Sequence, residues 1–230
     1  MDKKITIYHG SEHVVENPVW GVGRKHNDYG LGFYCTLDID LAKEWAVSSL
    51  GDGFANRYVL DTEDLSSLNL NSPEYTILNW IAVLIEHRLF SISNPVAARA
   101  KRYLIENYGI NVNSYDLITG YRADDSYFDF ADAFLNNSIT VEQLARAIHL
   151  GRLGEQIVVK SQFAFSRIRF EGYDVAPKIL YYTLRRSRND EAQRAYIKIL
   201  EEYSDGLFIS DILRGGIKND DPRIPRNIPQ

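Results

Sequence analysis

The sequence predicts an α+β fold, and the grouping of its segments indicates this class. Segments with the alternation of β-strands gather early in the chain and again around residue 160. Segments with a helical spacing of apolar residues lie between them and after residue 187. Strands and helices that are grouped in this way are typical of α+β proteins. A chain of 230 residues is long enough for one large domain, or for one domain with an appendage.

The first elements follow from local signals. Residues 4–8 alternate apolar and polar side chains and predict a strand that leads directly into a His-Gly pair. Residues 17–32 are rich in Gly and Asn and predict a loop, and residues 33–36 predict a second short strand. Asp38 is suited to cap a helix that we expect to end at Gly51.

The middle of the chain predicts a helical insert at about residues 73–108. Apolar residues recur at helical spacing from Ile77, and a second helix follows Asn94, where the next residue is a proline suited to the first turn. We also expect short strands at residues 57–60, 67–70 and 116–119.

The later elements end in a helical extension. Residues 140–150 predict a helix, because they open with the capping pattern Thr-x-Glu-Gln. Residues 157–159 and 163–170 predict two strands joined by a tight link, and residues 187–203 predict an amphipathic helix that is stopped by Gly206.

The expected organisation has three parts. Residues 1–176 form the main domain and residues 177–214 a C-terminal helical extension. Residues 215–230 contain three prolines and many charges, and we expect them to be a mobile tail.

The composition limits the possible classes of function. The net charge is −5 and the pI is about 5.6, so no general field favours nucleic acid or an anionic membrane. Cys35 is the single cysteine, which excludes an internal disulfide framework and a multi-thiolate zinc site. The N-terminus lacks the apolar core of a signal peptide, and residues 77–90 are too polar to span a bilayer. We therefore expect a soluble, cytoplasmic protein with no membrane partner.

Candidate binding residues are concentrated in the first 45 residues. The first strand runs into His9 and Gly10, which brings an imidazole together with an unshielded backbone amide. Tyr34 lies on the second strand, and Trp45 follows from the next helix. Two large aromatic faces beside backbone donors are suited to hold a flat ring that carries a carboxamide. Taken singly, His9 is more typical of a polar strand-end residue than of a ligand contact, and Trp45 is more typical of a core aromatic.

Two of these segments carry a resemblance. Residues 8–11 (Tyr-His-Gly-Ser) and 29–36 (Tyr-Gly-Leu-Gly-Phe-Tyr-Cys-Thr) resemble motifs of the ADP-ribosyltransferase superfamily, in its poly(ADP-ribose) polymerase-like or diphtheria-toxin-like branch. Over residues 4–214 the chain is similar to an uncharacterised bacterial domain family grouped with these transferases. Further motifs of that family match residues 120–128 and 153–158, so the resemblance rests on several short motifs that occur in the same order.

The resemblance implies a fold and a ligand. The fold is a split, two-sheet ADP-ribosyltransferase-like fold with helical insertions, and NAD⁺ is a co-substrate that lies in the cleft between the sheets. His9 is then expected to hydrogen-bond the nicotinamide ribose, and Gly10 to hold the carboxamide through its backbone. Tyr34 and Trp45 are expected to sandwich the ring, His9 and Tyr34 count among the catalytic residues, and no metal is expected.

The resemblance also implies a carboxylate at the start of a later strand, where this chain has Glu155. Departure of nicotinamide leaves an oxocarbenium-like ribose, whose charge a nearby carboxylate stabilises. The same group can orient or deprotonate the acceptor. Neighbouring strand residues point to opposite faces, so only one of Glu155 and Gln156 can face the ribose. We favour Glu155 and keep Gln156 as its rival.

The run at residues 120–128 has no agreed role in the superfamily. Arg122 is a candidate contact for the pyrophosphate of NAD⁺. Asp124 and Asp125 are suited instead to cap a helix that starts near Tyr127.

The expected function is that of a mono-ADP-ribosyltransferase, which moves ADP-ribose from NAD⁺ to a macromolecular acceptor, protein or nucleic acid, and releases nicotinamide. Small bacterial members of the superfamily often serve as toxins or effectors, which implies an antitoxin protein as a candidate partner. Two alternatives stay open: an NAD⁺ glycohydrolase with water as the acceptor, and a non-catalytic module that binds NAD⁺, ADP-ribose or a partner protein.

Overall fold

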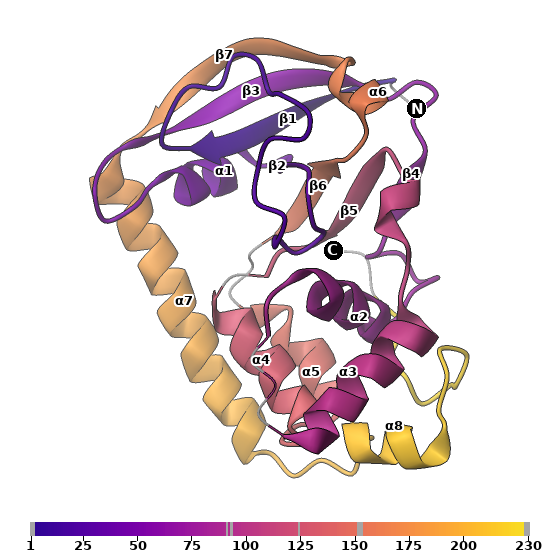
Figure 1. Cartoon of the computed structure of the whole chain (residues 1–230). Helices are drawn as coiled ribbons and strands as arrows, with labels where there is room; N and C mark the ends of the chain where they lie inside the picture. Colours follow the sequence, from indigo (N-terminus) through magenta and orange to yellow (C-terminus); the bar gives the residue numbers. More distant parts are fainter. Residues whose placement is uncertain (1–2, 91, 93, 124, 151–153, 228–230) are drawn as a thin grey trace.

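The structure is a computed structural model that describes residues 3–90, 92, 94–123, 125–150 and 154–227. Within these residues the chain forms a three-stranded sheet, a four-stranded sheet and eight α-helices, so the predicted α+β class is confirmed. The two sheets lie above a layer of helices, and one long helix runs down the side (Figure 1).

The three-stranded sheet is antiparallel throughout. Its order is β1 (Lys4–Ser11), β3 (Gly53–Asp61) and β7 (Ile168–Ala176). The first strand is longer than predicted, because His9 and Gly10 pair with residues of β3. The His-Gly pair therefore lies inside the strand and not beyond its end.

The four-stranded sheet lies between the first sheet and the helices. Its order is β2 (Phe33–Cys35), β6 (Glu155–Val159), β5 (Leu117–Tyr121) and β4 (Ser67–Asn69), with only the β4–β5 pair parallel. A backbone bridge joins the two sheets, where Tyr8 of β1 and Thr36 exchange hydrogen bonds of 2.8 and 2.9 Å.

The helices of the described residues fall into three groups. The layer beneath the four-stranded sheet contains α2 (Ile77–His87), α3 (Pro95–Tyr108), α4 (Asp125–Leu135), α5 (Val141–Ala147) and α8 (Ile209–Gly215) (Figure 1). A 3-10 helix, η1 (Val112–Ser114), follows α3. The short helices α1 (Ile39–Ala46) and α6 (Gln162–Phe165) accompany the sheets, and α7 (Lys178–Glu201) is the long helix at the side.

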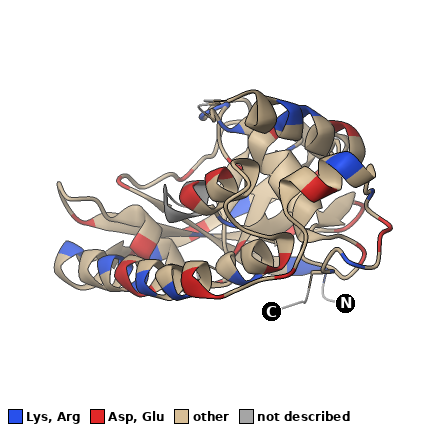
Figure 2. Cartoon of the chain, turned by 90° about the horizontal axis from the view of Figure 1, so that it is seen from below, with Lys and Arg blue, Asp and Glu red and all other residues tan. Residues whose placement is uncertain are grey.

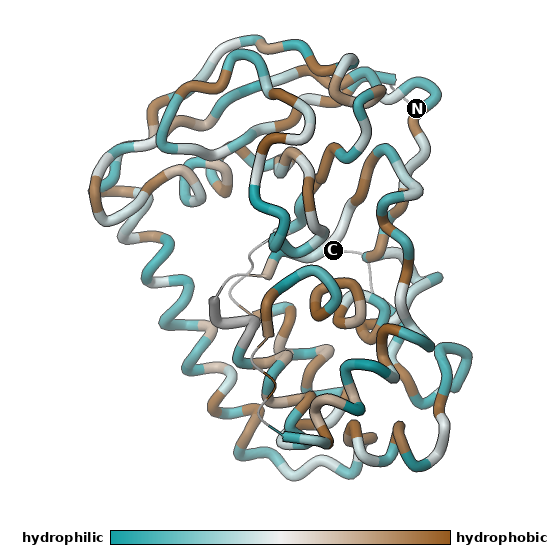
Figure 3. The backbone as a smooth tube through the Cα atoms, in the orientation of Figure 1, coloured by the Kyte–Doolittle hydropathy of each residue, from teal (hydrophilic) through white to brown (hydrophobic). Residues whose placement is uncertain are grey.

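Alternate residues of the central strand β6 reach two apolar cores. Ile157 and Val159 pack with Ile7 and Tyr58 in the core between the two sheets. Val158 belongs to the larger core, which lies between the helices and the other face of the four-stranded sheet. Hydrophobic segments accordingly follow the strands and the helices beneath them, whereas α7 is mostly hydrophilic along its length (Figure 3). The strand is therefore buried on both faces.

Several local predictions are confirmed by their capping bonds. The Asp38 carboxylate accepts hydrogen bonds from two backbone N–H groups in the first turn of α1. Asn94 caps α3, which has a proline at its first turn, and Thr140 and Gln143 form the capping box of α5. Side chains that satisfy the free N–H groups of a first turn fix where a helix begins. Helix α1 ends at Ala46, earlier than the predicted Gly51.

One strand prediction is wrong in its first half. Residues 163–165 form the short helix α6, because the Ser161 hydroxyl accepts a hydrogen bond from Ala164 N at 3.0 Å and caps the turn. The strand β7 begins only at Ile168. It joins the three-stranded sheet, so β6 and β7 do not form a hairpin.

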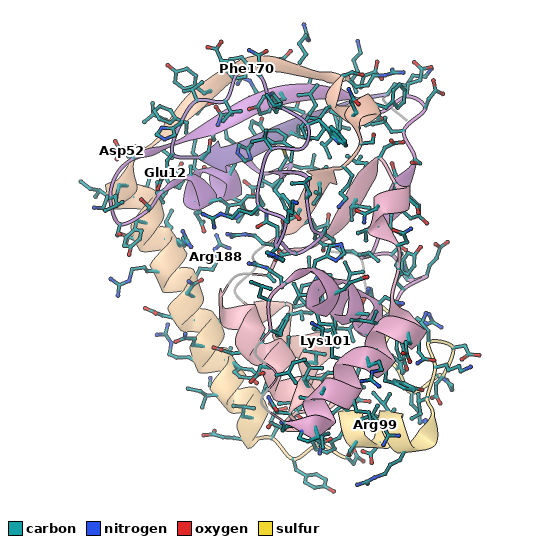
Figure 4. The ribbon with its side chains drawn as sticks, in the orientation of Figure 1. Glu12, Asp52, Arg99, Lys101, Phe170 and Arg188 are labelled. Atoms are coloured by element: carbon teal, nitrogen blue, oxygen red, sulfur yellow. The ribbon has the colours of Figure 1, made fainter. Side chains whose placement is uncertain are left out.

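Helix α7 connects the three-stranded sheet to the helical layer (Figure 1). It begins at Lys178, earlier than predicted, and its first N–H donates to Asp52 Oδ1 at 2.8 Å. Arg188 points from α7 toward α1 and pairs with the buried Glu44 at 2.7 Å (Figure 4). Near its other end a carbonyl of α7 accepts from Gln143 of α5 at 2.8 Å. The helix is therefore fixed to both layers.

The segment after α8 is packed, in contrast to the mobile tail expected from its composition. Ile217 and Ile224 are buried in the helical core. Asn227 donates through its backbone to Tyr75 O at 3.0 Å and through Nδ2 to Leu70 O at 2.6 Å. These contacts hold residues 215–227 against the rest of the fold. Among the described residues, no helix is both long enough and apolar enough to cross a membrane.

Candidate functional site

A polar cavity of about 190 Å³ lies where the two sheets diverge beyond the Tyr8–Thr36 bridge. Pockets that enclose a whole drug-sized ligand are typically about 300–1,000 Å³. This cavity is therefore suited to one end of an extended ligand. All of the predicted site residues except Glu155 are on its wall. The lining residues are His9, Gly10, Asn27, Asp28, Tyr34, Trp45, Arg88, Arg122, Ala123 and Gln156.

His9 presents one ring nitrogen to the protein. Its Nδ1 lies 2.7 Å from Tyr34 O, and because a carbonyl oxygen only accepts, Nδ1 carries the proton. The ring also packs against Phe33, with 4.5 Å between centroids. Burial lowers the pKa of His9, so the imidazole is neutral near pH 7. The remaining nitrogen, Nε2, is then a hydrogen-bond acceptor suited to a ligand hydroxyl.

Gly10 contributes its backbone to the cavity. Backbone groups of alternate strand residues point to the same edge, and Tyr8 bonds Thr36 on the edge that faces away from β3. The N–H and C=O of Gly10 therefore point to that edge, where the cavity begins. A Cβ on Gly10 would overlap the Ala42 carbonyl of α1. The glycine is thus required by close helix packing, and not only by access of a ligand to the backbone.

Tyr34 has its hydroxyl committed to the loop before β2. Its Oη donates to Gly30 O at 2.6 Å and accepts from Tyr29 N at 3.0 Å. Burial, followed by the nearby Asp28 charge, raises the pKa of Tyr34, so the phenol stays protonated. Gly30 has a φ of +75°, a conformation that favours glycine. Tyr34 can therefore offer the cavity its ring but not its hydroxyl.

Trp45 lies beside a cation. The Arg122 guanidinium carbon is 4.6 Å from the centroid of the indole ring, a cation–π distance. Trp45 Nε1 is buried and has no hydrogen-bond partner among the described residues. Buried donors in native proteins are nearly always paired, so an unpaired one at a cavity is available to a ligand.

The structure brings Gln156 into the cavity but does not bring Glu155 there. Gln156 is 3% exposed, and its Nε2 donates to Asp28 Oδ2 at 2.7 Å. Glu155 is not among the lining residues, and its Oε1 accepts instead from Asn71 Nδ2 at 2.6 Å. The predicted alternation thus separates the two neighbours, and the rival residue is the one at the cavity.

Sequence reasoning missed Asp28 and Arg88. Asp28 is 4% exposed and forms an ion pair with Arg88 Nε at 2.7 Å. Arg88 follows α2 as its C-cap residue, and both lie on the cavity wall. The lining residues include two arginines, Arg88 and Arg122, and guanidinium groups are suited to bind an anionic ligand group such as a phosphate. An Asn-Asp pair in a Gly-rich loop gave no sequence signal for this role.

Cys35 and two arginines of α7 lie outside the cavity and take part in packing. Cys35 is buried in the core between the sheets, and burial raises the pKa of its thiol. Two arginines of α7 are used in packing: Arg188 pairs with Glu44, and Arg185 donates to Val47 O at 3.3 Å. Residues of both charges alternate along α7 (Figure 2). Asp124 lies outside the described residues, and α4 begins at the next residue.

A larger hollow of about 550 Å³ lies along α7. Leu184, Ser187 and Glu191 of that helix line it together with His149 and Leu150. Among the described residues, its lining lacks the set of buried polar groups that converge on the first cavity. We therefore place the candidate site in the cavity between the sheets.

Comparison with known proteins identifies a family. A family model described as "Protein of unknown function (DUF3990)" matches residues 5–170, which is more than half of the chain. No curated protein and no solved structure gives a significant match. The matched residues include β2 to β6, all of β1 but its first residue, only residues 168–170 of β7, and every residue that lines the cavity. The chain belongs to the DUF3990 family.

Proposed function

We propose that the protein binds NAD⁺ through the cavity between its sheets and transfers ADP-ribose to a macromolecular acceptor, as an enzyme with an ADP-ribosyltransferase-like fold. One observation carries the proposal: His9, Gly10, Tyr34, Trp45 and Gln156 converge on a single cavity from β1, β2, α1 and β6. The motifs that resemble the superfamily are far apart in sequence, and their meeting at one polar cavity supports a shared ligand.

The residues at the cavity suit the nicotinamide riboside end of NAD⁺. The Gly10 N–H and C=O complement a carboxamide, which has an acceptor oxygen and a donor NH₂ group. The Tyr34 and Trp45 rings can flank the flat pyridine ring, and Trp45 Nε1 supplies a donor that lacks a partner among the described residues. His9 Nε2 is suited to accept from a ribose hydroxyl. Arg122 lies at the same wall and is the proposed contact for the pyrophosphate.

The chemistry that NAD⁺ supplies is a weak glycosidic bond, whose cleavage releases nicotinamide and leaves positive charge on the ribose. In this proposal Gln156 is the strand residue beside that ribose, and its amide oxygen is the group that faces the developing charge. Glu155 bonds to Asn71 and does not line the cavity, so it has no direct contact in this arrangement. Neutral dipoles are weaker stabilisers of a cation than a carboxylate, which predicts slow turnover.

A second candidate function is favoured by one observation. The Asp28 carboxylate is already bound by three donors, and Glu155 does not line the cavity. Within the described lining, no carboxylate is free to activate an acceptor. This favours a module that binds NAD⁺ or ADP-ribose without turnover.

One experiment separates the candidates. The purified chain is incubated with NAD⁺ labelled in the adenylate part, with and without cell lysate, and is titrated with NAD⁺ by calorimetry. Label transferred to protein or nucleic acid supports the transferase, and free ADP-ribose alone supports a glycohydrolase. Binding without release of nicotinamide supports the non-catalytic module. Absence of both binding and release would overturn the proposal.

A further inference from the structure

Asp28 is the most heavily engaged polar group at the cavity. It lies in the loop before β2 and is 4% exposed. Its Oδ1 accepts from Arg88 Nε at 2.7 Å, and its Oδ2 accepts from Ala123 N at 2.9 Å and from Gln156 Nε2 at 2.7 Å. The three donors come from the end of α2, the segment after β5, and β6. A buried carboxylate with a cationic partner and two further donors is fully satisfied as an anion.

This arrangement determines how the Gln156 amide is oriented. A carboxylate paired with a guanidinium only accepts hydrogen bonds, so the amide must turn its NH₂ group toward Asp28. The carbonyl oxygen, Oε1, is then the end of the amide that is left for the cavity. Without the Asp28 charge, the two ends of an amide are nearly equal in shape, and either can face a ligand.

We propose that Asp28 is a positioning residue that fixes Gln156 with its acceptor oxygen toward the ligand. This inference rests on the proposed function, because the group that uses the oxygen is a ribose hydroxyl of NAD⁺ or the charge that develops beside it. Arg88 supports the same geometry, because its guanidinium only donates and it holds Asp28 Oδ1 at 2.7 Å. The donor orientation of Gln156 would place an NH₂ group against a developing cation, which is unfavourable.

A purely structural role for Asp28 makes a different prediction. The carboxylate also ties three segments together, so its loss lowers stability whether or not the amide orientation matters. Stability and activity would then fall in parallel. An exchange of the two side-chain types separates these roles. It reverses the direction of the hydrogen bond between the two positions, but it restores an acceptor oxygen at the cavity and keeps the total charge.

The test uses Asp28→Asn, Gln156→Glu and the double variant. In Asp28→Asn the new amide cannot accept from all three donors. In a fraction of the molecules the Gln156 amide is therefore flipped, with its NH₂ group toward the cavity. In Gln156→Glu two carboxylates meet at hydrogen-bond distance, and one must take up a proton. In the double variant, the amide NH₂ introduced at position 28 can donate to the carboxylate introduced at position 156, whose other oxygen faces the cavity.

Release of nicotinamide and the melting temperature are measured for each protein, with Asp116→Asn as the matched control. Asp116 also holds a backbone N–H, that of Ser66 at 2.9 Å, but it does not line the cavity. We expect each single variant to lose about 10- to 100-fold in kcat/KM. The double variant should recover to within about fivefold of the wild type, and the control should keep full activity.

Two results would overturn the inference, and they are distinguishable. If the wild type releases nicotinamide but the double variant is no better than the single variants, Asp28 does not act through the orientation of Gln156, and the proposed function stands. If the wild type neither binds NAD⁺ nor releases nicotinamide, the proposed function fails, and the role of Asp28 toward a ribose fails with it.

Discussion

The same strands build two very different regions between the sheets. The core between the sheets is apolar and filled, with Ile7 of β1 and Ile157 of β6 almost fully buried. The cavity at its end is polar and hollow, with His9 of β1 and Gln156 of β6 on its wall. On β1, Ile7 and His9 are two residues apart and therefore lie on the same face of the strand. On β6, Ile157 and Gln156 are neighbours and therefore lie on opposite faces. Stability and ligand binding can therefore be changed separately, and four substitutions or conditions test that separation.

The largest expected effect is on the core. Ile157→Ala removes a side chain that is 4% exposed and leaves a cavity between the sheets. We expect it to lower the free energy of unfolding by about 2–5 kcal/mol, measured by denaturant titration. Leu50→Ala is the control, because Leu50 is 89% exposed. Below the unfolding transition, the NAD⁺ affinity of Ile157→Ala should stay within about twofold of the wild type. A large parallel loss of affinity would show that the two regions are coupled.

The next effect concerns the neighbours on β6. Gln156→Ala removes the amide at the cavity, whereas Glu155→Ala removes a side chain that bonds Asn71. We expect Gln156→Ala to reduce nicotinamide release by about 10- to 100-fold, and Glu155→Ala to reduce it by less than about threefold. Steady-state assays on folded protein measure both. The reverse order would restore Glu155 as the catalytic residue and would contradict the proposed role of the cavity face.

The third effect is a dependence on pH. Because burial lowers the pKa of His9 below 6.5, the folded protein binds fewer protons than the unfolded chain in this range. The contribution of His9 to stability is therefore present above pH 6.5 and is lost as the pH falls below it. The NAD⁺ affinity should be level from pH 8 to 6.5 and decrease only in more acidic solution. His9→Gln, which does not titrate, should give a flat profile at reduced affinity, and His13→Gln should follow the wild type. A drop that His9→Gln retains would assign the titration to another group.

The smallest expected effect concerns one hydrogen-bond donor, the Nε1–H group of Trp45. Trp45→Phe keeps an aromatic face but removes the buried Nε1–H that lacks a partner among the described residues. We expect a decrease in NAD⁺ affinity of about three- to tenfold, with little change in melting temperature. Trp20→Phe is the matched control, because Trp20 Nε1 donates to Lys160 O at 3.0 Å and does not line the cavity. Equal effects of the two substitutions would argue against a ligand contact at Trp45.

The sequence allowed the locally determined elements to be predicted. Asp38 and Thr140 begin helices through bonds that span two or three residues, so a short window contains the information. Residues 163–165 were misassigned because alternating phenylalanines are also compatible with a capped turn. The packing of residues 215–227 was missed because Asn227 bonds to Leu70, 157 positions away. No local pattern encodes such a contact.

The candidate site shows the same limit. The positions of His9, Gly10, Tyr34 and Trp45 followed from motifs, and these residues do line one cavity. The alternation of side chains along β6 placed Glu155 and Gln156 on opposite faces of the strand. It did not indicate which face lines the cavity, because that depends on where β1 and β2 diverge. Asp28 gave no signal at all, since its partners lie 60, 95 and 128 positions away.

Those separations also have a consequence for how the protein is made. The carboxylate of Asp28 gains its last partner only when Gln156 has left the ribosome, because the three donors follow Asp28 in chain order. Contacts between distant positions form late in folding, since a long loop must close first. An unfinished chain that ends before β6 therefore has no complete cavity. The protein being synthesised therefore lacks the proposed NAD⁺ site until about two thirds of the chain have been made, and the proposed consumption of NAD⁺ requires the folded product.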